Sequence, residues 1–166
     1  MLAAAAALCC VVAGCGSGEP ATGAGAPAAS QSAAPQRAAR IDACSMVAPQ
    51  DISSLLGVSV TGVSTGKTAQ MGDCTWTNPA TEESVSLTIS NPGTAADNKL
   101  PAPPSGFPLP NGPGPDGMRY LGGGQVEFAA GNRSNTVQVA VLRLSPSQAN
   151  AAAVDLARKI APKVPQ

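Results

Sequence analysis

Five cysteines are the residues of this chain whose type and spacing could support chemistry. Cys15 ends an apolar stretch that starts at Leu2, and a tract rich in Gly, Ser, Ala and Pro follows it at once. A run of about a dozen apolar residues suits a signal peptide and is too short to span a bilayer. The small Ala13 and Gly14 let the backbone enter a peptidase site, and the Cys15 thiol could then carry a thioether-linked lipid. We therefore expect residues 1–14 to be a signal peptide that is removed before Cys15.

The segment Val12 to Cys15 resembles a bacterial lipobox. The alternatives are a buried apolar helix and an ordinary secretory signal, and the abrupt change of composition after Cys15 argues against a core helix. Met1 and Leu2 provide no basic n-region, so we expect the start codon to lie upstream. We predict a lipoprotein whose Cys15 carries the lipid, palmitate included, at the extracytoplasmic face of the cell membrane.

Cys44 and Cys74 are the two thiols that remain, because Cys9 and Cys10 lie in the removed segment and Cys15 is lipidated. Outside the reducing cytoplasm, such a pair is expected to form a disulfide. Closing a loop of about 30 residues stabilises a fold by roughly 3 to 4 kcal/mol in the chain-entropy model. A metal site would need more ligands in a chain that has no histidine, and a redox pair would usually show a C-x-x-C spacing.

Other chemistry finds little support in the sequence. Without histidine, acid–base catalysis would fall to scattered carboxylates such as Glu82, Glu83 and Glu127, and Glu82 and Glu83 are expected at a solvated strand end. The phosphate-loop-like stretch 62–68 has its first glycine one position too late, and Gly122 to Gly124 is expected to be a tight turn or bulge. We therefore predict neither an enzyme nor a cofactor or metal site. Zero formal net charge and few aromatic residues also argue against a nucleic-acid partner.

The chain divides by composition into three parts. Residues 15–40 contain the lipidated cysteine and a tether of Gly, Ala, Pro, Ser, Thr and Gln, which we expect to be disordered. Residues 41–166 have the length of one domain. Their patterns predict a short helix within 47–57 and an Ala-rich helix that opens with a capping box at Ser145. Period-two alternation or β-branched residues predict strands near 58–63, 73–77, 84–90, 126–130 and 137–141.

These elements predict an α+β fold in a single domain. We expect a twisted antiparallel sheet of about five strands, with the short N-terminal helix and the C-terminal Ala-rich helix packed on it. The segments 126–130 and 137–141 are expected to form a hairpin across the turn-like stretch 131–135.

Three stretches of the chain resemble the actinobacterial lipoproteins grouped as domain of unknown function 3558. They are Asp42 to Asp51, Leu55 to Gly57 and Cys74 to Trp76, although Ala48 stands where the family usually has a capping threonine. The resemblance implies a lipobox, a low-complexity tether and an α+β domain on the cell surface. It implies no established reaction, so it adds location and fold more than chemistry.

Asn91 to Gly117 is too long for an ordinary connection and is rich in Pro and Gly. Its apolar Leu100, Phe107 and Leu109 could form a loop that binds a partner, and the alternative is a mobile insertion without function. We predict that the protein binds another envelope protein. The second hypothesis is a small apolar envelope ligand held between the sheet and the C-terminal helix, which would be favoured by a closed pocket lined by four residues: Phe128, Val139, Leu156 and Ile160.

Overall fold

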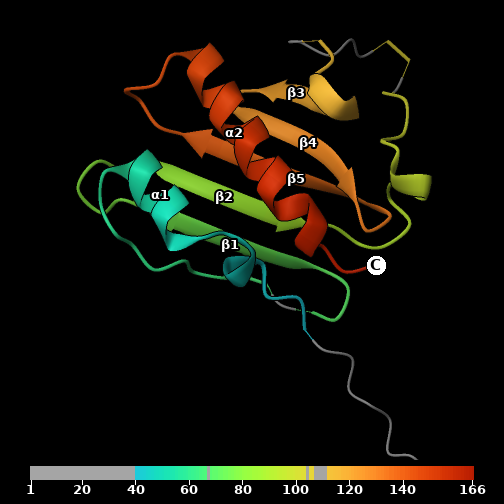
Figure 1. Ribbon diagram of the computed structural model, residues 1–166, viewed down its shortest axis with the longest axis horizontal. Coiled ribbons are helices and arrows are strands. Elements are labelled where there is room, and N and C mark those ends of the chain that lie inside the picture. The colour runs from blue at the N-terminus through green and yellow to red at the C-terminus, as the bar shows by residue number, and fades with distance from the viewer. Residues whose placement is uncertain (1–39, 67, 104, 107–111) are drawn as a thin grey trace, which may run out of the picture. The chain divides into compact units, whose positions relative to one another are not determined.

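A computed structural model describes residues 40–66, 68–103, 105–106 and 112–166 of the chain (Figure 1). They form a five-stranded antiparallel sheet in the order β1-β2-β5-β4-β3. The strands are β1 Gly72–Thr77, β2 Ser84–Ile89, β3 Arg119–Gly122, β4 Gln125–Ala130 and β5 Arg133–Ala140. Two α-helices, α1 Pro49–Leu56 and α2 Pro146–Ile160, and a 3-10 turn, η1 Ala43–Met46, accompany them. The predicted α+β fold is confirmed.

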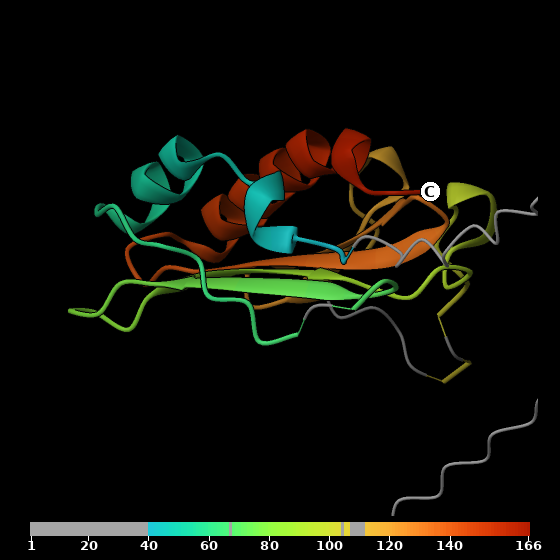
Figure 2. The same ribbon diagram turned by 90° about the horizontal axis from the view of Figure 1, so that it is seen from below.

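The helices lie on one face of the sheet, and no helix covers the other face in the part of the chain that the structure describes (Figure 2). Alternation along the strands produces this asymmetry, because successive side chains point to opposite faces. Apolar side chains that face the helices are almost fully buried, whereas the opposite face carries Ser, Thr, Gln and charged residues that are half-buried or exposed. The buried set comprises Cys74, Trp76, Val85, Leu87, Ile89, Val126, Phe128, Val137 and Val139.

Helix α2 begins with the predicted capping box. The Ser145 hydroxyl accepts from the Gln148 backbone N–H at 3.3 Å, and the Gln148 side chain accepts from the Ser145 N–H at 2.9 Å. The buried side of the helix carries small residues beside larger aliphatic ones, which lets it approach the sheet closely. These residues are Ala149, Ala153, Val154, Leu156, Ala157 and Ile160.

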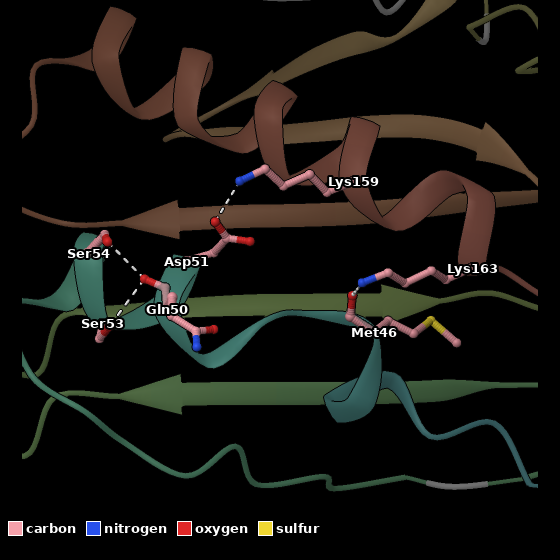
Figure 3. Close-up of polar contacts among 7 residues, drawn as sticks. All are labelled: Met46, Gln50, Asp51, Ser53, Ser54, Lys159 and Lys163. Atoms are coloured by element: carbon pink, nitrogen blue, oxygen red, sulfur yellow. Dashed lines mark hydrogen bonds and ion pairs between the residues drawn. The ribbon is translucent and has the colours of Figure 1, made fainter.

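The short helix α1 is held by residues far away in the sequence. Gly57 ends it at φ 70°, a left-handed conformation that suits glycine. The carbonyls of its last turn would lack helical partners, and they accept hydrogen bonds from the Arg143 guanidinium and the Asn78 amide instead. The C-terminal part of the chain adds two further contacts: Lys159 on α2 pairs with Asp51 (Figure 3), and Lys163 donates to a carbonyl of η1.

The hairpin prediction is confirmed, with a shorter turn than expected. Gly131 and Asn132 alone form the turn, at φ 63° and 56°, and Arg133 already pairs with Ala130. Positive φ at both central residues matches the right-handed twist of the flanking strands. Arg133 is buried in this strand, and its guanidinium donates to the backbone carbonyls of Gln70, Ser90 and Pro165.

The predicted strand at 58–63 is wrong. Only Val63 forms an isolated bridge there, with Thr75 of β1. Gly62 passes so close to the core that a Cβ atom would lie 2.4 Å from the Cys74 sulfur and 2.6 Å from the Trp76 Nε1 atom. The segment therefore covers the outer edge of β1 as a loop. The fifth strand is β3, whose four residues are too few to show a clear alternation in the sequence.

The triple glycine forms the predicted tight turn. Gly122, Gly123 and Gly124 all have positive φ, and the register of β3 on β4 shifts just before them. A Cβ atom on Gly124 would lie 2.3 Å from the Val139 carbonyl oxygen and 2.9 Å from the Ala149 Cβ. Glycine is required at this position because the turn passes directly under the start of α2.

Candidate functional site

The predicted site residues fall into two groups. Cys15, Phe107 and Leu109 lie outside the described residues, while Leu100 is half-buried. Cys44 and Cys74 form the predicted disulfide, which ties η1 to β1 with the two Cα atoms 5.1 Å apart. Cys74 is fully buried beside Trp76, so the bridge is part of the core.

The connection between β2 and β3 is anchored at its beginning to the turn of the β4–β5 hairpin. Backbone N–H groups of Gly93 and Ala95 both donate to the Asn132 carbonyl, at 2.8 and 3.2 Å. In return, the Asn98 side chain accepts from the Asn132 N–H at 2.8 Å, and the Thr94 hydroxyl accepts from the Ser134 N–H at 2.8 Å. Ala95 is fully buried at this contact. Four hydrogen bonds thus fix the first part of the connection to a rigid hairpin.

A second anchor fixes the end of the same connection. Pro113 forms a bridge with Arg119 of β3, and the Gly114 N–H donates to the Met118 carbonyl at 2.8 Å. Asp116 forms an ion pair with Arg158 of α2 at 2.9 Å, and the hydrogen bond that the guanidinium donates to this carboxylate raises the pKa of Arg158. Met118 is buried in the core. The last residues of the connection are therefore bound to both the sheet and α2.

We call residues 99–112, which lie between the two anchors, the presented segment. Of its described residues, Leu100 and Gly112 are half-buried, and the others are exposed. Pro101 and Pro103 lack an N–H group, so this part of the backbone has fewer donors for pairing with a strand. An exposed, proline-rich backbone with fixed ends suits recognition by a partner, because anchoring the ends reduces the entropy lost on binding.

A separate open hollow of about 470 Å³ lies at one end of the sheet, beside the start of α2. Its walls come from the turn before β2, the glycine turn between β3 and β4, and the chain from the end of β5 into α2. It is lined by Thr81, Glu82, Glu83, Gly123, Gly124, Val139, Ala140, Val141, Leu142, Leu144, Pro146 and Ala149. Of the four residues considered for a closed pocket, only Val139 lines it; Phe128, Leu156 and Ile160 pack in the core.

Glu83 is buried at this hollow, which corrects the expectation of a solvated strand end. One carboxylate oxygen accepts from the Leu142 backbone N–H at 2.7 Å, and the other accepts from the Thr81 hydroxyl at 3.1 Å. Only Glu82 of the acidic pair is exposed. Leu142 is 87% exposed at the rim and adds aliphatic surface beside the hollow.

The third carboxylate considered for catalysis, Glu127, is engaged on the open face of the sheet. It forms an ion pair with Arg119 at 3.0 Å and accepts a hydrogen bond from the Ser134 hydroxyl. The structure thus gives Glu127 and Glu83 separate hydrogen-bond partners on different elements. Within the described ranges, no three His, Cys, Asp or Glu side chains come close enough together to hold a metal ion.

Sequence reasoning missed both anchors and the hollow. The side chains of Thr94 and Asn98 form hydrogen bonds with residues 34 to 40 positions away in the sequence. No local sequence pattern predicts partners at that distance. The strongest available signals were the Thr and Asn residues after β2, since such side chains often accept hydrogen bonds from nearby backbone. For the hollow, the signal was the aliphatic Leu142 beside an Arg, outside any predicted element.

Comparisons of this chain with protein-family models, curated proteins and solved structures find no match. The resemblance to the domain of unknown function 3558 lipoproteins therefore rests on the quoted residues alone and stays a prediction. No helix within the described residues has the length and apolar character needed to cross a membrane.

Proposed function

We propose that this protein is a lipid-anchored binding protein at the extracytoplasmic face of the cell membrane, and that it binds another envelope protein through the presented segment. The anchor is Cys15, and residues 16–40 tether the domain to it. Catalysis has no part in this function. The observation that carries the proposal is the double anchoring of the connection between β2 and β3, together with the exposure of the segment's described residues other than Leu100 and Gly112.

The disulfide supports the proposed location. Cys44 and Cys74 are joined in the core, and structural disulfides persist mainly in compartments outside the reducing cytoplasm. Cys15 precedes the tether in the sequence and lies in a lipobox-like context, so one lipid-modified residue would bring the domain to the membrane surface.

The anchor is tested by replacing Cys15 with alanine in the full chain. We expect this chain to leave the membrane fraction or to accumulate unprocessed, because no other cysteine occupies a lipobox-like context. Cell fractionation followed by mass spectrometry of the N-terminal peptide measures both effects. Membrane attachment that persists in the Cys15→Ala chain would contradict the proposed anchor, and a Cys10→Ala chain serves as the matched control.

The binding role is tested by replacing Leu100, Phe107 and Leu109 with serine together in the full chain. We expect the protein to lose its cross-linked envelope partner, while its thermal midpoint changes little because the anchors at Thr94, Asn98 and Asp116 are untouched. Val63→Ser is the matched control, since Val63 is 62% exposed and lies on the loop along β1. A partner retained by the triple variant, or a thermal midpoint lowered by many degrees, would refute the role of the segment.

The second candidate function is binding of a small apolar molecule. The open hollow beside α2 favours it, because 470 Å³ lies within the usual range for small-molecule sites and aliphatic residues form most of the lining.

A further inference from the structure

The hollow beside α2 has walls that are fixed before any ligand arrives. Glu83 in the turn before β2 bonds within that turn to Thr81 and across to the Leu142 N–H, just after the end of β5. Gly124 is packed against Val139 and Ala149, so the glycine turn cannot move inward. Preformed walls lower the conformational cost of binding. This is the arrangement expected of a small-molecule site rather than of a flexible surface.

The lining combines aliphatic side chains with negative charge. Val139, Val141, Leu142, Leu144 and Pro146 contribute apolar surface, and Leu142 remains 87% exposed at the rim. The charged residues among the lining are two glutamates, Glu82 and Glu83, and no Lys or Arg is among the described residues that line the hollow. An apolar ligand that covered Leu142 would remove aliphatic surface from water and be stabilised accordingly.

The cation nearest in sequence does not neutralise these carboxylates. Arg143 follows Leu142, but its guanidinium donates to the Ser54 and Leu55 carbonyls at the end of α1. The N-terminus of α2 contributes a partial positive charge of about half an elementary charge. Its capping box already compensates part of this charge. Two carboxylates outweigh this partial charge, so the hollow favours a positively charged group.

We propose that the hollow binds a small aliphatic molecule that carries one cationic nitrogen, with its chain against Leu142, Leu144 and Pro146 and its cation beside Glu82. This inference rests on the second candidate function. It adds that the small ligand carries a positive charge as well as an aliphatic chain. Glu82 is the residue that recognises the cation, because it is exposed, whereas both oxygens of Glu83 already accept hydrogen bonds from the protein. The site shares no residue with the presented segment.

The test uses the full chain in its membrane and a photoreactive octylammonium probe that has a diazirine on its alkyl chain. After irradiation, mass spectrometry maps the labelled residues. We expect labelling to concentrate on residues 139–146, and to fall about fivefold in the Glu82→Gln chain, as for the loss of one surface charge pair. Leu142→Ser, a change at an exposed position, should also reduce labelling. Asp155→Asn, which removes the same charge from an exposed site outside the hollow, should leave labelling unchanged.

An octanol probe with the same diazirine shows whether binding in the hollow needs the cation or only the aliphatic chain. Weak labelling by the alcohol supports the cation requirement. Equal labelling of residues 139–146 by both probes, or labelling unaffected by Glu82→Gln, would overturn the inference while the second candidate function stood. Labelling spread evenly over the chain with both probes would overturn the inference and the second candidate function together.

Discussion

Cys74 carries two structural roles at once, as a disulfide partner and as packing surface. Its sulfur is bonded to Cys44, 30 positions earlier, and Gly62 passes against it where no larger residue fits. The disulfide therefore stabilises the native state both through the cross-link and through the core around Trp76. The sequence predicted the bond because the other cysteines were assigned elsewhere, but it gave no sign that Gly62 packs there.

We expect Cys74→Ser to lower the free energy of unfolding by roughly 2 to 5 kcal/mol, because a long loop in the unfolded chain is no longer closed. Urea denaturation of the full chain measures the change. Adding a reducing agent to the unchanged protein should cost a similar amount, whereas it should do little to the variant. Two titratable thiols at Cys44 and Cys74 in the native protein would contradict the account.

Asp73 on β1 holds the loop that covers the edge of this strand. Its carboxylate accepts from the Thr65 hydroxyl at 2.7 Å and from the N–H groups of Thr65 and Gly66 at 2.7 and 3.1 Å. The Thr65 hydroxyl contributes most to a lowered pKa of Asp73, partial burial opposes it, and the two N–H groups add to the lowering. A lowered pKa means that the folded state favours the charged carboxylate.

The pH dependence follows from that direction. Asp73 should stabilise the fold fully above its pKa in the unfolded chain, about 3.9, and progressively less as the pH falls through the lower pKa of the folded state. We therefore expect the stability difference between the unchanged chain and Asp73→Asn to be largest near neutral pH and to vanish in strong acid. Urea denaturation at a series of pH values measures it, and a difference that grows as the pH falls would disprove the role of Asp73.

Among the elements, α2 is the one whose start the local sequence predicted most directly. Ser145, Pro146 and Gln148 predicted its start, and the structure has the reciprocal capping bonds. Strand β2 was equally visible, since it alternates apolar and polar residues over six positions. Strands β4 and β5 show a shorter alternation, because β4 ends on two alanines and β5 begins with four polar residues. By contrast, the sequence predicted a strand at 58–63, where the structure has a loop, and did not predict β3. β-Branched residues favoured a strand at 58–63, while packing of Gly62 on the core decided against it.

We expect Ser145→Ala to lower the free energy of unfolding by about 1 kcal/mol, because the Gln148 N–H loses its acceptor and the capping box is broken. Thermal or urea denaturation measures this loss. Ser54→Ala is the matched control: its exposed hydroxyl donates only to the Gln50 carbonyl within α1 (Figure 3), so alanine should cost nothing there. An equal loss in both variants would show that the cap contributes no more than an ordinary surface serine.

Two features of the whole molecule, the first anchor of the presented segment and the hollow, could not be predicted from local sequence patterns. The strand order places β5 between β2 and β4, so the hairpin of β4 and β5 meets the end of β2. This arrangement brings Asn132 and Ser134 to the connection after β2 and creates the first anchor of the presented segment. The hollow likewise depends on three turns that are distant in sequence. Long-range pairing determines both features, and the chain's alternation pattern contains no information about which strands become neighbours.

The proposed binding role requires the presented segment to contact an envelope protein in the cell. A photoreactive phenylalanine analogue placed at position 107 of the full chain tests it most directly, with the same analogue at Thr88, exposed on the open face of the sheet, as the matched control. We expect irradiation to join position 107 to one reproducible envelope protein, and position 88 to give no such product. An identical product from both positions, or no product from position 107 in membrane-attached protein, would contradict it.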